Sequence, residues 1–157
     1  MGQVHGGIPA AAPADYDVSQ VVGYVLKQAA TALRAAMDTV LRPLELSVPQ
    51  YACLELLDGQ PGLSNADLAR GAFVTRQSMN GVLRGLEERG LVTRPSTAPH
   101  GRALPSQLTA AGHQKLKIAR GVVREVEQRM LAHLSGHEQR RLRRDLAKCV
   151  ESLESTT

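Results

Sequence analysis

The side chains best suited to chemistry in this sequence form a polar row between positions 76 and 84. The row consists of Arg76, Gln77, Asn80, Gly81 and Arg84, which helical spacing places on one face of a helix. Asn and Gln can form two hydrogen bonds to adenine, and Arg can form two to guanine, through the edges that these bases expose in the major groove. The row therefore predicts a helix that reads DNA bases, although any one of these residues alone is also typical of an ordinary solvated helix face.

The residues around the polar row predict two short helices joined by a tight turn. Ser64 followed by Asp67 predicts the capped start of a helix over about 64–71, and Thr75 predicts the cap of a second helix that runs to about Arg89. The buried stripe of the second helix is expected to comprise Met79, Val82, Leu83 and Leu86. Near the helix starts, the candidates for contact with DNA phosphates are Ser64, Thr75 and Ser78.

A β-hairpin is predicted directly after the second helix. Gly90 ends that helix, residues 91–94 have the pattern of a strand, residues 95–101 have the composition of a turn, and a second strand follows over about 103–108. Thr109 is expected to cap the next helix. The hairpin residues expected to reach phosphates or a minor groove are Arg94, His100 and Arg102. This order of elements predicts a winged helix-turn-helix.

These motifs resemble the MarR family of bacterial transcription regulators. The resemblance is carried by the run from Ala66 to Arg70, by TRQSMNGVLRGLEERGLVTR and by LTAAG after the wing, and it extends over nearly the whole chain beyond residue 17. The sequence departs from the family at the wing tip, where the family often has Asp-x-Arg and this chain has His100-Gly101-Arg102. The arginine carries over, whereas the acidic residue that usually steadies it does not.

Helical patterns fill the rest of the chain. Helices are expected over about 17–42, 47–57 and 109–134, and a last helix from residue 135 onward. Capping pairs mark three of these helix starts, namely Asp17 with Gln20, Ser47 with Gln50, and Ser135 with Glu138.

The predicted fold class is mainly α with a small β-hairpin wing, an α+β winged helix-turn-helix with N- and C-terminal dimerisation helices. Residues 1–16, rich in Gly, Ala and Pro, are expected to form a flexible N-terminal tail. Residues 17–157 are expected to form a single MarR-like domain. Within it, residues 47–109 form the winged helix-turn-helix, and residues 17–46 and 110–157 form the dimerisation helices.

Composition and charge agree with a nucleic-acid ligand. The net charge is +4, and residues 63–109 contain six Lys or Arg against three Asp or Glu, whereas residues 1–62 contain three against six. Positive charge is therefore concentrated where phosphates are expected. With no Trp and one Phe, the core must be built mainly from Leu, Val, Ala and Met, a mixture that favours helices.

Other broad classes of protein find no support in the sequence. The first 16 residues lack the basic start and the apolar run of a signal peptide, and no stretch approaches the roughly 20 apolar residues that span a bilayer. A soluble, cytoplasmic protein without a membrane partner is expected. No Gly-x-Ser-x-Gly elbow, Walker loop or Gly-x-Gly-x-x-Gly occurs, so neither an enzyme nor a bound cofactor is predicted.

The apolar stripes of the first and last helices predict a homodimer. The small winged domain cannot cover both stripes fully, and pairing them with their copies across a two-fold axis solves this problem. A dimer places its two reading helices ~34 Å apart, about one turn of DNA, so the expected partner is double-stranded DNA with an inverted repeat. The resemblance to the family implies the same arrangement.

The resemblance also implies a small-molecule ligand. Members of the family commonly bind small aromatic or phenolic anions between the dimerising helices and the winged domain, and binding alters the spacing of the reading helices. The residues that can line such a crevice here are Tyr24, Lys27, Arg34, Met37 and Tyr51. Each of them also has an ordinary alternative as a core or surface residue.

Simpler explanations are favoured for the remaining reactive side chains. Cys53 is expected to be a buried, reduced thiol rather than a redox sensor, and Cys149 is also expected to be reduced. His133 and His137 have the spacing of a helical metal pair, but the helix is expected to break between them, so surface histidines and no metal site are predicted. The arginines within 140–144 are expected to form a solvated helix face, with a second DNA site as the alternative.

Taken together, the patterns predict a sequence-specific, dimeric DNA-binding transcription regulator, a repressor of an inverted-repeat operator that a small aromatic ligand releases. A DNA-binding architectural protein without a ligand is the competing class, and a winged helix that binds proteins instead of DNA is a more distant one. Steep salt dependence with strong preference for one inverted repeat would separate the first class from both others.

Overall fold

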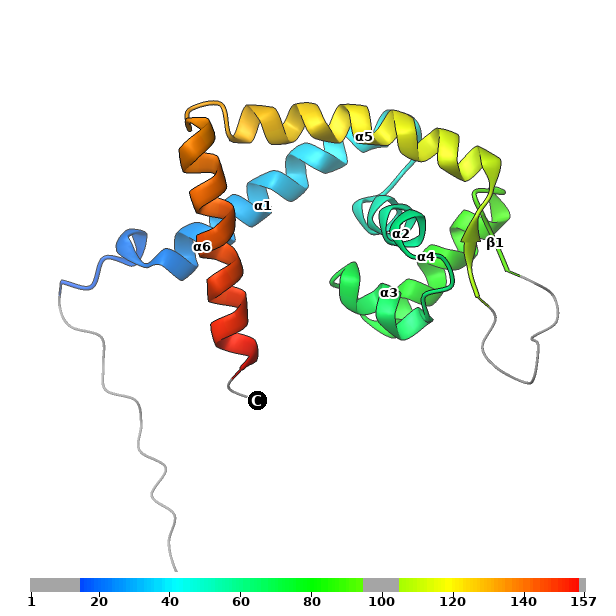
Figure 1. Ribbon diagram of the computed structural model, residues 1–157, viewed down its shortest axis with the longest axis horizontal. Coiled ribbons are helices and arrows are strands. Elements are labelled where there is room, and N and C mark those ends of the chain that lie inside the picture. The colour runs from blue at the N-terminus through cyan, green and yellow to red at the C-terminus, as the bar shows by residue number, and fades with distance from the viewer. Residues whose placement is uncertain (1–14, 95–104, 156–157) are drawn as a thin grey trace, which may run out of the picture. The chain divides into compact units, whose positions relative to one another are not determined.

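The computed structural model describes residues 15–94 and 105–155, which form helices and one short hairpin (Figure 1). The chain divides into two compact units at residues 32 and 33, within the first long helix. In chain order the elements are a 3₁₀ helix Val18–Gln20, α1 Val22–Leu41, a 3₁₀ helix Arg42–Leu44, α2 Val48–Gly59, α3 Asn65–Gly71, α4 Arg76–Glu88, β1 Val92–Thr93, β2 Gln107–Leu108, α5 Ala110–Met130 and α6 Gly136–Glu154. The predicted fold class, mainly α with a two-stranded wing, is confirmed.

The first helix differs from the prediction at its start. Asp17 was expected to cap a continuous helix, but its carboxylate accepts the Ser19 N–H at 2.9 Å and so caps a separate turn of 3₁₀ helix. Val21 then has an extended backbone, with φ −84° and ψ 117°, which interrupts the helical geometry. The α-helix therefore begins only at Val22.

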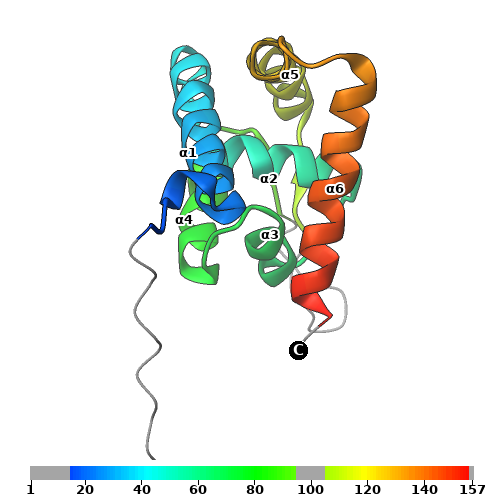
Figure 2. The same cartoon turned by 90° about the vertical axis from the view of Figure 1, so that its left-hand side faces the viewer.

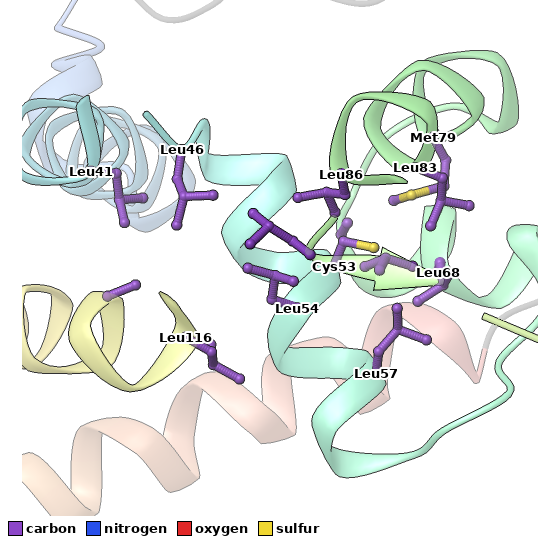
Figure 3. Packing of buried hydrophobic residues seen from close by; sticks show 14 of the residues in the cluster. Leu41, Leu46, Cys53, Leu54, Leu57, Leu68, Met79, Leu83, Leu86 and Leu116 are labelled. Carbon is purple, nitrogen blue, oxygen red and sulfur yellow. The ribbon is translucent and has the colours of Figure 1, made fainter. Parts of the chain in front are cut away.

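The core of the second unit is built around α2. Cys53, Leu54 and Leu57 of this helix are buried, and side chains of α3, α4 and α5 pack around them. Figure 3 shows this packing, with Leu68 of α3 and Leu116 of α5 among the buried side chains. The core consists almost entirely of aliphatic and sulfur-containing side chains, as the composition predicted.

The apolar stripe of α4 is buried as predicted. Met79, Leu83 and Leu86 are each at most 1% exposed, and Val82 is half-buried against the same cluster. Burial of a side chain of this size stabilises a fold by about 1.5–3 kcal/mol. Three such side chains on one stripe fix the rotation of α4 about its axis, so the same packing determines which residues of the helix face solvent.

The ends of α4 follow the predicted chemistry. Thr75 caps its start, and the chain leaves its end through Gly90, whose φ of 70° lies in the left-handed region that glycine adopts easily. The N–H groups of Gly90 and Leu91 donate to the carbonyl oxygens of Glu87 at 3.0 Å and Leu86 at 2.9 Å. This pattern is a Schellman motif, which satisfies two carbonyl groups at the helix end.

The strands of the wing pair as an antiparallel ladder but are shorter than predicted. Val92 lies opposite Leu108, and Thr93 lies opposite Gln107. Leu91 was expected within the first strand, but its N–H closes α4 and its carbonyl oxygen accepts the Thr109 N–H at 3.1 Å. The backbone of Leu91 therefore joins two helix ends, and the predicted hairpin turn 95–101 lies outside the described residues.

The start of α5 sits tightly against this base of the wing. Thr109 caps α5 as predicted, and its hydroxyl donates to the Gly90 carbonyl oxygen at 2.6 Å. A Cβ atom at Gly112 would lie 2.1 Å from the Leu91 carbonyl oxygen, so only glycine allows this close approach. The wing is thereby attached to both α4 and α5.

A network of charged side chains links α2 to α5. Arg120 of α5 donates to both carboxylate oxygens of Glu55, at 2.7–3.1 Å, and to Asp58 at 2.6 Å. The Tyr51 hydroxyl donates to Glu55 at 2.7 Å, and His113 lies 3.2 Å from Asp58. Nothing in the hydrophobic periodicity indicated this network, because Arg120 and His113 are far in sequence from the α2 residues that they contact.

The helix after the wing ends earlier than predicted, and the last helix starts where predicted. Instead of continuing to Leu134, α5 ends at Met130, and the side-chain amide of Gln139 donates to the carbonyl oxygens of Leu131 at 3.3 Å and Leu134 at 3.0 Å. Ser135 and Glu138 form the predicted capping box of α6. Among residues 15–94 and 105–155, no helix has the length and apolar character needed to cross a membrane.

The network supports a prediction about stability and pH. Burial raises the pKa of Glu55, but the hydrogen bonds from Arg120 and Tyr51 outweigh it and hold the pKa below its ordinary value of 4.5. The hydrogen bond from Arg120 is the main reason that the pKa of Asp58 lies below 3.8. Since both values are lower in the folded chain, the stabilisation is present at neutral pH and is lost as the pH falls through the lowered values.

We therefore expect Arg120→Met to lower the melting temperature by a few degrees at neutral pH, with a deficit that shrinks below about pH 4. Thermal denaturation followed by circular dichroism across this pH range measures both effects. Arg124→Met, at an exposed position of the same helix, is the matched control. A deficit that stays constant with pH would contradict the role given to the two carboxylates.

Candidate DNA interface

The outward face of α4 carries the predicted polar row. Because Met79 and Leu83 are buried, the opposite side of the helix is turned to solvent. The exposed residues of this side are Arg76, Gln77, Asn80, Gly81 and Arg84. The structure thus brings the candidate base-reading residues together on one accessible surface, which we call the α4 reading face. Their contact with bases stays a prediction.

The three predicted phosphate-binding hydroxyl groups lie at helix starts, where Ser64 and Thr75 form caps and Ser78 lies in the first turn of α4. Ser64 accepts the Asp67 N–H at 3.1 Å at the start of α3, and Thr75 accepts the Ser78 N–H at 3.1 Å at the start of α4. The Thr75 hydroxyl also donates to the Ser78 hydroxyl at 3.0 Å. These bonds hold the first turn of α4, whose amide groups and partial positive charge suit a phosphate.

Asn80 has a neighbour that the sequence analysis did not find. The Asn65 side-chain amide donates to the Asn80 side-chain oxygen, linking the first residue of α3 to the middle of the α4 reading face. The Asn80 oxygen keeps one lone pair, and its amide group keeps its donors, so pairing with adenine remains possible. Asn65 follows the cap residue Ser64 in the sequence, but no local pattern signals that it reaches Asn80 across the turn.

Arg94, the residue directly after β1, is held at the base of the wing. Its Nε donates to the Ser106 hydroxyl at 3.1 Å and lies 2.8 Å from the Glu87 carboxylate of α4. The guanidinium therefore joins both strand ends to α4. The sequence indicated Arg94 but not Glu87, because an ion pair between residues on different elements leaves no periodic signal. His100 and Arg102, the two candidates at the wing tip, lie outside the described residues.

The orientation of α4 is also fixed at its far end. The Arg89 guanidinium donates to the carbonyl oxygens of Leu44, at 3.4 Å, and Glu45, in the turn that precedes α2. Glu45 has a φ of 56°, so this turn uses a left-handed residue to present its carbonyl groups. Arg89 thus anchors the last turn of the reading helix to the segment between α1 and α2.

The proposed ligand residues differ in their surroundings. Tyr24 and Lys27 are exposed on the first part of α1, and Arg34 is exposed further along the same helix. Met37 and Tyr51 are half-buried, and both pack against the core of the second unit. The hydroxyl of Tyr51 is bound to Glu55. Burial and this hydrogen bond both raise the pKa of Tyr51, so the phenol stays protonated near neutral pH.

Cys53 has the predicted burial, and the two histidines lie at the surface as predicted. Cys53 is fully buried, and this burial raises the pKa of its thiol to about 12, so it carries little of the thiolate that redox chemistry requires. Cys149 is exposed, and both are free cysteines. His133 and His137 are exposed and do not share a helix. Across residues 15–94 and 105–155, no group of three or more His, Cys, Asp and Glu side chains is placed to hold a metal ion.

Together these elements define a class of protein. A short helix, a tight turn, a second helix with an exposed polar face and an antiparallel hairpin follow one another along the chain, and α3 and α4 pack together (Figure 2). This arrangement is a winged helix-turn-helix.

Comparisons with known proteins agree with this class. Residues 44–103 match the model of the MarR family. Among curated proteins, the HTH-type transcriptional repressor Rv2887 of Mycobacterium tuberculosis is 46% identical over 127 residues, which cover 81% of this chain and 91% of the relative. The crystal structure of Rv2887 with salicylic acid has a TM-score of 0.70 at 45% identity and covers 82% of this chain and 95% of its own. The structure of Rv2887 with DNA has a TM-score of 0.69 at 44% identity, with 82% and 96% covered.

The chain belongs to the MarR family of winged helix-turn-helix transcription regulators, as its motifs predicted, and not to a family of enzymes.

The Asn65–Asn80 pair supports a prediction about base readout. We expect Asn80→Ala to lower affinity for the specific DNA site by about 1–3 kcal/mol, while binding to unrelated DNA changes little, because an amide that pairs with a base carries sequence information. Fluorescence anisotropy with both DNA types at one salt concentration measures this difference.

Asn65→Ala serves as the companion variant for this test. This substitution should also lower the affinity for the specific site, but by less than Asn80→Ala does, because it leaves the Asn80 side chain in place and removes only the neighbour that orients it. An equal loss of affinity on specific and unrelated DNA after Asn80→Ala would remove Asn80 from the reading residues.

Proposed function

We propose that this chain is a homodimeric repressor that binds an inverted-repeat operator through two α4 helices and is released by a small aromatic carboxylate. The observation that carries the proposal is the α4 reading face, whose exposed Arg, Gln and Asn residues lie opposite a stripe that is buried in the core. The relative Rv2887 is a transcriptional repressor and has been crystallised with DNA, which supports the same role here.

The charge and wing of the chain suit a DNA duplex. The segment from residue 63 to residue 109 has an excess of three positive charges, which favours the approach of phosphates. The hairpin is attached to α4 by Arg94 and to α5 by Thr109, so its base keeps a constant position relative to the reading helix. In this proposal the wing tip, with His100 and Arg102, contacts the backbone or the minor groove beside the site read by α4.

The last helix supports a homodimer. No residue of α6 is buried, although its apolar residues recur on one face, namely Leu142, Leu146, Val150 and Leu153. A groove lies between the end of α5 and the start of α6, lined by Met130, Leu131 and two of these leucines. A second copy of the chain, related by a two-fold axis, would cover this face and bring two α4 helices to one side. In this proposal residues 17–46 and 110–157 provide the dimer contacts and residues 47–109 the DNA contacts.

A small aromatic acid is the proposed releasing ligand. Structures of Rv2887 with salicylic acid and with p-aminosalicylic acid show that this relative binds such compounds. In this chain we assign Lys27 and Arg34 to the carboxylate, and Tyr24, Met37 and Tyr51 to the aromatic ring. The chemistry of the set fits, because it combines cationic groups with polarisable apolar surface.

Selection of bound sequences from a random pool of duplex DNA tests the proposed function. We expect the full-length protein to select one inverted repeat whose half-sites are centred about 10 base pairs apart, and its affinity to fall steeply with salt. Binding that depends on salt but shows no sequence preference would indicate an architectural protein. Absence of DNA binding would favour a winged helix that recognises proteins.

The ligand prediction follows from linkage between the two sites. A molecule can release DNA only if it binds one arrangement of the two reading helices more tightly than another, and such coupling is typically ~1–3 kcal/mol. Salicylate at saturation should therefore weaken operator binding about 5- to 150-fold. Titration of salicylate into the labelled operator complex, followed by fluorescence anisotropy, gives this ratio directly.

Arg34→Ala is the control variant for the titration and should show a reduced response at equal operator affinity. The repressor-release model would fail if a panel of aromatic acids bound the free protein and left operator affinity unchanged.

A further inference from the structure

The only phenylalanine of the chain lies on the surface, in the turn between α3 and α4. This residue is 93% exposed, more than any other large hydrophobic residue in the described part of the chain. A protein without tryptophan and with a single phenylalanine has few aromatic side chains with which to fill its core. At position 73 the ring contributes almost nothing to that core, so its presence there needs another physical reason.

The backbone conformation of Phe73 is also unusual for an aromatic residue. Its φ is 58°, in the left-handed region where a bulky side chain is unfavourable and glycine is usual. The Phe73 N–H donates to the Arg70 carbonyl oxygen at 3.2 Å, and the Val74 N–H donates to the Ala69 carbonyl oxygen at 3.0 Å. These two bonds form a Schellman motif that ends α3, with Phe73 at the position that most often holds glycine. Folding of the turn alone would favour a glycine over an aromatic residue at this position.

The surroundings of the ring point to DNA as its partner. Phe73 precedes the α4 cap residue Thr75 by two positions, and the N-terminal turn of the second helix is the part of a helix-turn-helix that contacts base edges. Arg70 and Arg76, on either side of the turn, are both exposed. An exposed ring in a turn that two exposed arginines flank in the sequence suits a surface on which phosphates alternate with apolar carbon, as they do along a DNA strand.

We propose that Phe73 is a DNA-contact residue whose ring packs on apolar carbon of the operator, either a thymine methyl group or a deoxyribose, next to the start of the α4 reading face. The proposal rests on the proposed function and extends it to a residue that the sequence analysis did not select. An aromatic side chain can bury roughly 150–250 Å² of surface, and the methyl group of thymine is an apolar feature of the major groove. Binding would therefore remove from water a ring that the free protein leaves exposed.

The test compares Phe73→Gly with Phe73→Leu in the full-length chain. Glycine removes the ring and suits the left-handed turn, so Phe73→Gly should keep the melting temperature of the wild type or raise it by about 2–4 °C. Its affinity for the selected operator should nevertheless fall about tenfold or more, the change expected when a contact of this size is lost. Phe73→Leu, which keeps an apolar side chain, should retain most of the affinity.

Modified operators identify which carbon the ring contacts. If it is a thymine methyl group, replacing one thymine of the operator by uracil should weaken the wild type and leave Phe73→Gly unaffected. If it is a deoxyribose, no uracil substitution should matter, and Phe73→Gly should lose equal affinity for the operator and for a scrambled duplex. Either result supports the proposal.

Four outcomes would overturn the proposal. Wild-type affinity in Phe73→Gly would show that the ring does not contact DNA, while the proposed function would stand. A lower melting temperature in Phe73→Gly would assign the ring a structural role. If light scattering shows that Phe73→Gly no longer self-associates, while the affinity of each dimer for DNA is unchanged, the ring belongs to a contact between copies of the chain. A wild-type protein that selects no sequence would overturn both this proposal and the proposed function.

Discussion

The burial of one stripe of α4 against α2 is the constraint on which the rest of the structure depends. Met79, Leu83 and Leu86 have almost no exposed surface, so rotation of α4 about its axis would expose them and leave cavities in the core. Because side chains of a helix are fixed relative to one another, this burial also turns Asn80 and its neighbours outward. The packing that stabilises the core therefore also determines the orientation of the reading face.

Polar contacts then hold the elements that the apolar core leaves free to shift. Arg120 connects α5 to α2 through two carboxylates, and Arg89 connects the end of α4 to carbonyl groups of the turn before α2. At the base of the wing, Gly112 allows α5 to approach Leu91 closely. These contacts hold the base of the hairpin at a fixed position relative to the core. A wing needs such a fixed position if it is to reach DNA together with α4.

Two exposed apolar features are unfavourable in the isolated chain and suit surfaces that a partner covers. The apolar face of α6 lies along a helix without a single buried residue, in keeping with a symmetric contact between two copies. Phe73 lies next to the start of α4, in a backbone conformation that costs less for glycine. In the proposed function a second copy of the chain covers the apolar face of α6. A DNA strand covers the ring of Phe73.

Local patterns in the sequence determined the elements and their exposed faces. Ser64, Thr75 and Ser135 act on backbone groups within three residues, so the helix starts that they mark could be predicted from spacing alone. Only the tertiary structure decided that Asn65 meets Asn80, that Glu87 meets Arg94, and which carboxylates bind the guanidinium of α5. Such pairs join residues on different elements, and their formation depends on how those elements pack, for which a single sequence contains no periodic signal.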